Sequence, residues 1–265
     1  EHYFPKELIP KMGELGLMGS IIPPEYGGSG LSTLAYALII EELSAACAST
    51  GIIVSAHTSL CVTPIIDYGT EEQKKYFLPR LASGQALGCF ALSEPSTGSD
   101  AAAITTTYKE DGDGYVINGT KNWITNAPEA GVCVVFASRD TSKGNKTISA
   151  FVHDMSLPGI SRGKHEDKMG IRGSPTSSIM YDNVRVPKSA LLYEENRGFT
   201  VAMTTLNGGR IGVASQAVGI ARSALDDALK YAQERKAFGK AICEHQSIQN
   251  YFAEMVCRID SARYL

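Results

Sequence analysis

Two short stretches of the chain carry the side chains that are best suited to chemistry. Residues 89–100 read CFALSEPSTGSD, and residues 118–126 read NGTKNWITN. Each stretch begins as an apolar strand and then turns into small hydrogen-bonding residues with glycine, and the second holds Trp123, the only tryptophan. Strand ends that present hydroxyls, backbone amides and one large aromatic face can hold a flat, polar-edged, phosphorylated ligand.

The first stretch offers groups that match a flavin. Ser93 and the amides beside it could bond the heteroatoms of an isoalloxazine ring, and Pro95 turns the chain sharply after them. Residues 97–100 add hydroxyls and amides without bulk, which suits a phosphate or an amide-bearing tail. The structural alternatives are a plain Ser/Gly-rich turn here, and a Trp123 that packs in the core. We interpret the two stretches as a flavin cradle.

Two later segments also combine charge with unusual backbone. Gly208 and Gly209, followed by Arg210, lie inside a helical pattern, where each glycine costs ~1 kcal/mol relative to alanine. Either a neighbouring helix packs closely there, or a ligand approaches the backbone and Arg210 meets a carbonyl or phosphate. Residues 234–240 end the same helix with cations, which suits the helix dipole. They are either a solvated basic end or a pyrophosphate clamp.

The elements that must position these residues follow in three blocks. Helical spacing dominates residues 1–86, with Phe4, Leu8, Met12 and Leu15 in the first helix. Further helices are expected from Ser32 or Thr33 to about 44, over 50–66, and from a capping box at Thr70 to about Gly84. His57 lies on an apolar helix, where a hydrogen-bonded core histidine is expected rather than a catalytic one. The glycine-rich loop 22–30 is interpreted as a turn, because no phosphate-loop Lys-Ser/Thr follows.

The middle block, residues 87–190, is strand-like, and residues 191–265 are helical again. Strands are expected at 87–92, 104–109, 115–118, 122–125, 131–138, 147–153 and 177–186. Residues 111–114 (DGDG) indicate a hairpin. A helix over 198–234 would be ~55 Å long at ~1.5 Å per residue, so it belongs in a bundle, and a subunit contact is one option. The expected class is α+β multidomain: an N-terminal helical domain, an antiparallel β-barrel or sandwich, and an incomplete C-terminal helical bundle.

Composition narrows the function further. The 265 residues carry a net charge of −3, which gives no support to nucleic-acid or membrane-surface binding. The six cysteines show no metal-ligand spacing, so we expect a reducing compartment, no disulfide and no metal. No run of 18 apolar residues is present, so no membrane span is expected. The last helical pattern stops at Leu265 without an end signal, and we expect the chain to be cut at both ends, with further helices to follow.

The motifs in series resemble the acyl-CoA dehydrogenase family. Besides ALSEPSTGSD and GTKNWITN, the chain carries KMGIRGSPT at 168–176, NVRVP at 183–187, RKAFGK at 235–240 and HQ at 245–246. The resemblance covers essentially all of the chain, and RIGVASQA at 210–217 brings it closest to the short-chain, butyryl-CoA members. It implies three domains, at 1–86, 87–190 and 191–265, and usually a homotetramer.

The resemblance also implies roles for individual residues. Phe90, Leu92 and Ser93 would line the flavin, with Trp123, Ile124 and Thr125 closing over it. Ser99 would contact both the cofactor region and the CoA arm. The substrate-contacting positions are Asn207 and Arg210, and the positions that hold the FAD of a neighbouring subunit are Arg235, Phe238 and Gln246.

The implied reaction is FAD-dependent α,β-dehydrogenation of a short-chain acyl-CoA to a trans-2-enoyl-CoA in fatty acid β-oxidation. A glutamate removes the α-proton, the flavin takes the β-hydride, and an electron-transfer flavoprotein takes the electrons. The implied compartment is the mitochondrial matrix, with a bacterial cytoplasm as the alternative. The alternative functions are a short branched-chain acyl-CoA dehydrogenase, a flavin- or acyl-CoA-binding scaffold without a base, and, less favoured, an acyl-CoA oxidase.

Two departures from the family pattern concern catalysis. The usual Tyr-Glu-Gly-Thr segment that holds the catalytic glutamate is absent, and the alternative base position on the long helix is Gly209. The catalytic residue is therefore unknown, and a base glutamate is expected beyond Leu265. Asn207 stands where short-chain members often carry aspartate.

Overall fold

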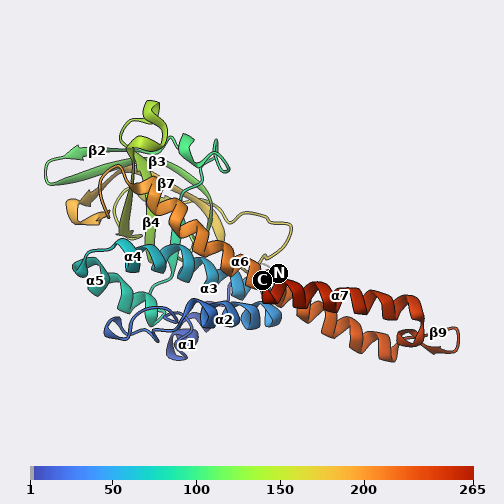
Figure 1. Ribbon diagram of the computed structural model, residues 1–265. Helices are drawn as coiled ribbons and strands as arrows, with labels where there is room; N and C mark the ends of the chain where they lie inside the picture. Colours follow the sequence, from blue (N-terminus) through green and yellow to red (C-terminus); the bar gives the residue numbers. More distant parts are fainter. Residues whose placement is uncertain (1–2) are drawn as a thin grey trace.

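The computed structural model describes residues 3–265 as a helical and β-sheet body with a long two-helix arm (Figure 1). The N-terminal helices lie on one side of the sheet. Their bounds are α1 (Leu8–Glu14), α2 (Thr33–Ala46), α3 (Ala48–Ser55), a π-helical segment (Ala56–Val62), α4 (Thr63–Tyr68) and α5 (Glu71–Ala82). The predicted helix–strand–helix order is confirmed.

Local sequence signals explain several of these helix ends. The Ser32 hydroxyl accepts a hydrogen bond from the Ala35 amide and caps α2, and Thr70 forms the predicted capping box with Gln73 at the start of α5. The helical stripe predicted for the first helix is wrong in part. The buried residues of α1 are Ile9 and Met12, whereas Leu15 is exposed.

The segment predicted as one helix over 50–66 is interrupted by the π-helical turn. Pro64 has no amide to bond the Leu60 carbonyl, and the Thr63 amide and hydroxyl both donate to the Thr58 carbonyl instead. The whole stretch Ala48–Tyr68 is long and apolar enough to cross a membrane, contrary to the sequence-based expectation. However, 72% of its most apolar window is buried inside the protein, as in a core helix.

The central sheet has eight strands. They are β1 (Gly88–Ala91), β2 (Thr107–Asp111), β3 (Gly114–Thr125), β4 (Val132–Ser138), β5 (Ile148–Asp154), β6 (Ile160–Arg162), β7 (Thr176–Pro187) and β8 (Leu191–Leu192). The order is β6-β7-β3-β2-β4-β5-β8, with β1 beside β4. Most pairs are antiparallel as predicted, but β1 runs parallel to β4, and β2 meets β4 in parallel at a single residue pair. The hairpin at 111–114 is confirmed, whereas β6 and β8 were not predicted.

Strand β4 is buried on both faces and separates two cores. Val132, Val134 and Phe136 face the helices, while Cys133 and Val135 face the interior of the β-domain. Such a strand reads as a continuous apolar run rather than an alternating one. The helices and the sheet therefore share one continuous packed body.

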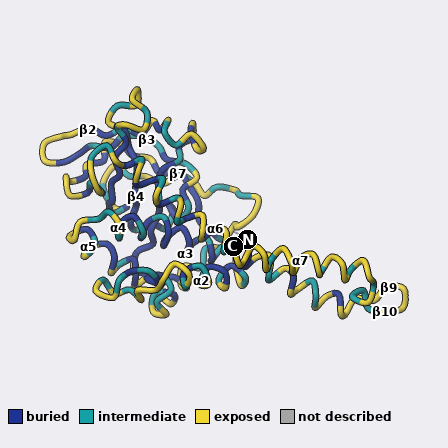
Figure 2. The backbone as a smooth tube through the Cα atoms, in the orientation of Figure 1, coloured by how far each residue is buried: buried dark blue, intermediate teal, exposed yellow. Residues whose placement is uncertain are grey.

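Helix α6 (Gly198–Glu234) has the predicted bounds and leaves the body partway along its length. Close approach to α2 explains its glycines there, since a Cβ on Gly219 would lie 2.2 Å from the Glu41 carbonyl oxygen. Beyond the body come β9 (Lys236–Ala237), β10 (Lys240–Ala241) and α7 (Gln246–Tyr264), which runs back along α6 (Figure 1). Helix α7 contains no buried residue, and Figure 2 shows this arm mostly exposed.

Candidate active site

A cavity of about 530 Å³ lies where the ends of β1 and β3 meet α6 and the π-helical segment. Eight of the sequence-predicted site residues line it: Phe90, Leu92, Ser93, Ser99, Trp123, Ile124, Thr125 and Arg210. The fold thus brings the two motif stretches together with α6. The volume is in the range of small-molecule sites.

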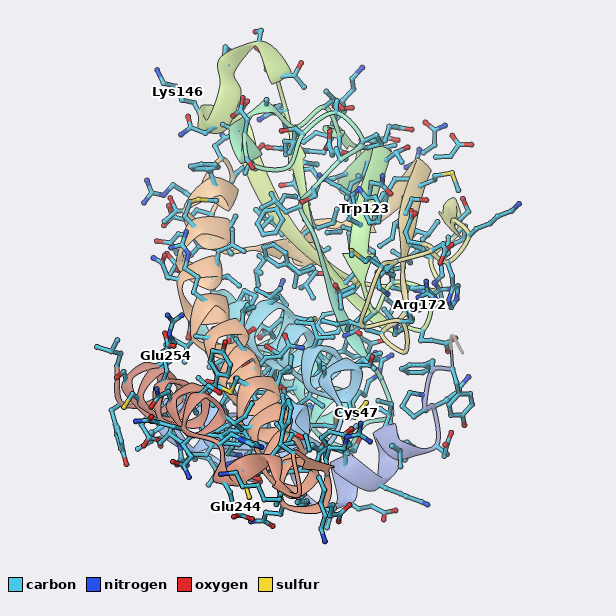
Figure 3. The ribbon with its side chains drawn as sticks, turned by 90° about the vertical axis from the view of Figure 1, so that its right-hand side faces the viewer. Cys47, Trp123, Lys146, Arg172, Glu244 and Glu254 are labelled. Atoms are coloured by element: carbon cyan, nitrogen blue, oxygen red, sulfur yellow. The ribbon has the colours of Figure 1, made fainter. Side chains whose placement is uncertain are left out.

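Trp123 reaches the cavity because β3 bulges. The pairing of β3 with β7 shifts register between Lys121 and Ile124, and Trp123 has a φ of 59°, a left-handed conformation that costs an L-residue about 1–2 kcal/mol. Its side chain is 56% exposed, so it is not the core tryptophan of the structural alternative (Figure 3). A large ring held at a strained backbone position in a cavity wall points to a binding role.

The Asn126 side chain holds the end of the bulge in place. This residue also has a positive φ, of 70°, and its buried amide nitrogen donates to the carbonyls of Ile53 and Gly88. Its backbone amide donates to the Pro175 carbonyl at 2.7 Å. One side chain therefore links β3 to α3 and β1, which are distant in sequence.

The first stretch forms a tight turn beside this end of β3. The Asn122 amide donates to the Ser93 carbonyl at 2.9 Å, and Glu94 and Thr97 exchange backbone hydrogen bonds of 2.8 and 3.2 Å. The turn leaves Ser99 in the cavity wall, with its hydroxyl available to a ligand. The Ser/Gly-rich segment is therefore both a turn and part of the site.

A buried ion pair lies behind this wall. Lys121 and Glu94 have fully buried side chains, and the Lys121 ammonium lies 2.8 Å from a Glu94 carboxylate oxygen. Burial lowers the pKa of Lys121 to about 8, although Glu94 opposes the shift. Burial alone would raise the pKa of Glu94, but the Lys121 charge and the hydrogen bonds from Lys121, Thr105 and Thr106 outweigh it and lower that pKa to about 2.

The contacts of α6 distinguish between close helix packing and ligand approach as explanations for Gly208 and Gly209. A Cβ on Gly209 would lie 2.8 Å from a methyl of Leu60, so close packing explains this glycine, whereas Gly208 faces open space. The Arg210 guanidinium donates to the Asn207 side-chain oxygen. An adjoining cavity of about 550 Å³ shares Leu60 and Arg210 with the first and continues along apolar side chains that include Ile52, Val213 and Ala217.

Some lining residues were not singled out from the sequence. Phe199, Met203 and Leu206 come from α6, and Ala56 and Leu60 come from the π-helical segment. The helical spacing of 199, 203, 206 and 210 was a signal that could have shown a shared face with Arg210.

Three predicted site residues lie elsewhere, on the arm. Arg235, Phe238 and Gln246 are exposed at the far end of α6 and the start of α7, and none lines the cavity. Phe238 is 97% exposed, and its ring meets only His245 edge-on, at 5.9 Å between centroids, among the ring contacts of the described chain. Within one subunit, this group cannot reach the cavity walls.

His57 is the hydrogen-bonded core histidine that the sequence predicted. One ring nitrogen accepts from the Gly88 amide at 3.0 Å, and the other donates to the Met18 carbonyl at 3.2 Å. Burial lowers its pKa to about 4, so the ring is neutral at pH 7. Among residues 3–265, no cluster of three or more His, Cys, Asp or Glu side chains is placed to hold a metal ion.

Three family models match the chain in succession. They are the N-terminal domain (residues 1–85), the middle domain (89–184) and the C-terminal domain (196–265) of acyl-CoA dehydrogenase. The chain is 51% identical over its whole length to the short-chain specific acyl-CoA dehydrogenase, mitochondrial, of Mus musculus, but spans only 64% of that protein. It is 46% identical to the short-chain specific acyl-CoA dehydrogenase of Clostridium acetobutylicum, with 99% of the chain covering 69% of that protein.

Solved structures agree. Butyryl-CoA dehydrogenase from Megasphaera elsdenii matches with a TM-score of 0.97 at 45% identity, over 99% of this chain and 70% of that one. A structure described as the electron transferring flavoprotein of Acidaminococcus fermentans matches at 0.97 and 49% identity, over 99% and 69%. A glutaryl-CoA dehydrogenase from Mycobacterium smegmatis in complex with FADH2 matches at 0.92 and 36% identity, over 99% and 66%. The cavity walls, the domain order and these relatives together show that the chain belongs to the acyl-CoA dehydrogenase family.

Proposed function

We propose that the whole protein is an FAD-dependent enzyme that converts short-chain acyl-CoA thioesters to trans-2-enoyl-CoA in fatty acid β-oxidation. The observation that carries the proposal is the convergence of Ser93, Trp123, Thr125 and Arg210 on one cavity that continues into an apolar one. A polar-edged site joined to an apolar pocket suits a cofactor beside an acyl chain.

The residues present fit an FAD. Ser93 and Thr125 supply hydroxyls at the two strand ends, Trp123 supplies an aromatic face, and a Cβ on Gly98 would meet nothing within 4 Å, so the backbone is open to a ligand. Phe90, Leu92 and Ile124 add apolar wall. When bound, FAD would accept the hydride that leaves the β-carbon. Support comes from the related glutaryl-CoA dehydrogenase, which was solved with FADH2.

The substrate would lie between this wall and α6. Arg210, oriented by Asn207, supplies positive charge for the CoA moiety, and Ser99 supplies a hydroxyl. The acyl chain would enter the apolar cavity beside Leu60 and Val213. In this way the chain's own residues bind and orient the thioester.

The proton acceptor is proposed to be a glutamate outside these 265 residues, expected beyond Leu265. Two observations support this proposal. The apolar cavity has no carboxylate in its wall, and the candidate base position on α6 is Gly209. The chain also spans only 64% of its mouse relative.

The arm suggests an assembly. Arg235, Phe238 and Gln246 would bind the FAD of a neighbouring subunit, in a homotetramer whose subunits divide into domains at 1–86, 87–190 and 191–265. The electron acceptor would be an electron-transfer flavoprotein, and the description of one matched solved structure names such a protein, from Acidaminococcus fermentans. The compartment would be the mitochondrial matrix, with a bacterial cytoplasm as the alternative, since relatives of both origins match.

The test uses the full-length protein with butyryl-CoA. The purified protein should be yellow, and its flavin absorbance should bleach when butyryl-CoA is added without oxygen. Stronger bleaching with a short branched acyl-CoA would favour the branched-chain alternative. FAD or acyl-CoA binding without bleaching would favour the scaffold without a base, and a colourless protein would contradict both dehydrogenase functions.

A further inference from the structure

The buried pair of Lys121 and Glu94 differs from the other ion pairs of the described chain. It is the pair in which both side chains are fully buried, whereas each other pair keeps at least one partner partly exposed. Burying two charges costs several kcal/mol per ion, and an apolar pair of similar volume is often as stable. Stability alone therefore does not explain why these charges lie here.

The carboxylate of Glu94 is saturated with donors. One oxygen accepts from the Lys121 ammonium at 2.8 Å and from the Thr106 amide at 2.9 Å. The other accepts from the Thr105 amide and hydroxyl, both at 2.6 Å. Charge-assisted bonds of this kind are short and strong, so Glu94 fixes the segment before β2 to the strand end that carries it.

The ammonium of Lys121 connects the same group to the cavity wall. It donates to the Leu92 carbonyl at 3.0 Å, and Leu92 and Ser93 both line the cavity. The next residue of β3, Asn122, donates its amide to the Ser93 carbonyl, and Trp123 follows in the bulge. The pair therefore lies directly behind both walls at the point where they are joined.

We propose that Lys121 and Glu94 are a positioning pair that locks the two strand ends in register and sets the electrostatic field felt by the flavin. This inference rests on the proposed function, because it assumes that FAD occupies the cavity. In a water-excluded interior, an unbalanced charge behind the wall acts strongly on the negative charge that flavin gains on reduction. Neither side chain lines the cavity, so both act through Leu92, Ser93 and the bulge.

The experiment compares Glu94→Gln, Lys121→Met and the double variant with the wild type, in the full-length protein. FAD affinity of the apoprotein, the flavin absorbance spectrum, the reduction potential and the thermal midpoint are measured. Glu94→Gln removes the charge that opposes the burial shift, so the pKa of Lys121 falls further, and the potential of this variant is measured from pH 8 down to pH 5. Where Lys121 is protonated the potential should rise above the wild-type value, whereas Lys121→Met leaves a negative charge held by the Thr105 and Thr106 donors and should lower it. Each change should alter the affinity ratio of reduced to oxidised flavin at least tenfold, which is about 30 mV for a two-electron couple.

The double variant distinguishes the electrostatic effect of the pair on the flavin from its effect on the register of the two strand ends. It buries no unpaired charge, so its reduction potential should return close to the wild-type value. Its FAD affinity should be at least tenfold lower than that of the wild type, because the Leu92 carbonyl has lost its donor. If a single variant fails to fold, the FAD affinity of the double variant still decides the question. The matched control is Tyr181→Phe, which removes a buried hydroxyl bonded to His153 at 3.2 Å and lies outside the cavity.

The outcomes are distinct. Variants that lose thermal stability but keep the wild-type spectrum, potential and FAD affinity would overturn the inference and leave a structural ion pair. So would a control that shifts the flavin as much as the variants do. A wild-type protein that takes up no FAD would overturn the proposed function and this inference with it.

Discussion

The cavity walls and the arm were predicted to bind the same cofactor, yet they are built in opposite ways. The walls hold a buried ion pair, a strained Trp123 and the Asn126 side chain that bonds two distant carbonyls. The arm presents Arg235, Phe238 and Gln246 to solvent, and its α7 buries no residue (Figure 2). The cavity walls are ordered by contacts within this chain, whereas the arm presents side chains that no described part of its own chain covers.

This difference separates two kinds of binding energy. Residues that are already fixed lose little conformational entropy when a ligand arrives, whereas exposed long side chains must still be ordered. Changes in the body should therefore alter stability and ligand affinity together. Changes in the arm should alter only what the arm contacts.

The largest expected effect is the loss of stability of the body at low pH, caused by buried His57. His57 stays neutral in the fold down to pH about 4, whereas an unfolded histidine takes up a proton near pH 6.5. The unfolded state binds more protons across this window, so the stability present above pH 6.5 is lost as the pH falls through 4, by about 3 kcal/mol. Denaturant unfolding between pH 7 and 4 should show this slope, and His57→Gln should flatten it. Equal slopes in both proteins would exclude His57 as the source.

A matched pair of alanine substitutions on α6 compares a glycine packed against α2 with a glycine that faces open space. Gly219→Ala should destabilise the protein by about 1–3 kcal/mol, because the new methyl would meet the Glu41 carbonyl and force α2 away. Gly208→Ala, in the same helix, should stabilise it by about 0.5–1 kcal/mol, since nothing lies within 4 Å of the new methyl. Thermal midpoints measure both. Effects of the same sign would show that the approach of the two helices does not decide stability.

Substitution of Trp123 should separate binding from stability within the wall. Trp123→Gly relieves a positive φ and removes a side chain that is 56% exposed, so the free energy of unfolding should change by less than about 1 kcal/mol. FAD affinity should fall by about 3–10-fold through the loss of aromatic contact. Fluorescence titration of the apoprotein and a thermal scan test the two expectations. A stability loss above about 2 kcal/mol would make Trp123 a packing residue.

The smallest effect on stability is expected in the arm. Arg235→Ala and Phe238→Ala should change the free energy of unfolding of a single subunit by less than about 0.5 kcal/mol, because both side chains are exposed. If the arm binds the cofactor of a neighbour, the same variants should weaken FAD retention on dilution. Size-exclusion chromatography with absorbance detection measures retention. Unchanged retention at every concentration would contradict a role across a subunit contact.

The sequence predicted most of what depends on local signals. The bounds of α6, the capping box at Thr70 and the hairpin at 111–114 all follow from the spacing or chemistry of adjacent residues. The two motif stretches were also placed correctly at one cavity. This interpretation came from the residue types of the two stretches, with a plain turn as the alternative, and the family resemblance then supported it.

The features that sequence missed depend on contacts between distant segments. Residues 115–118 and 122–125 were predicted as separate strands, but they are one bulged strand, held by Asn126 through carbonyls in α3 and β1. Lys121 and Glu94 are charged residues that would be expected at the surface, and only their mutual approach across two strands makes burial possible. No periodicity reports such pairings.

The π-helical segment has a consequence for how the cavity wall can change. A π turn holds one residue more than an α turn, and it ends where the ordinary helical pattern resumes. Loss of one residue within 56–62 would convert the turn to α-helix while α3 and α4 kept their places against the sheet. Because Ala56 and Leu60 line the cavity while Cys61 and Val62 of the same segment pack in the core, the length of this segment couples the shape of the pocket to the packing beneath it.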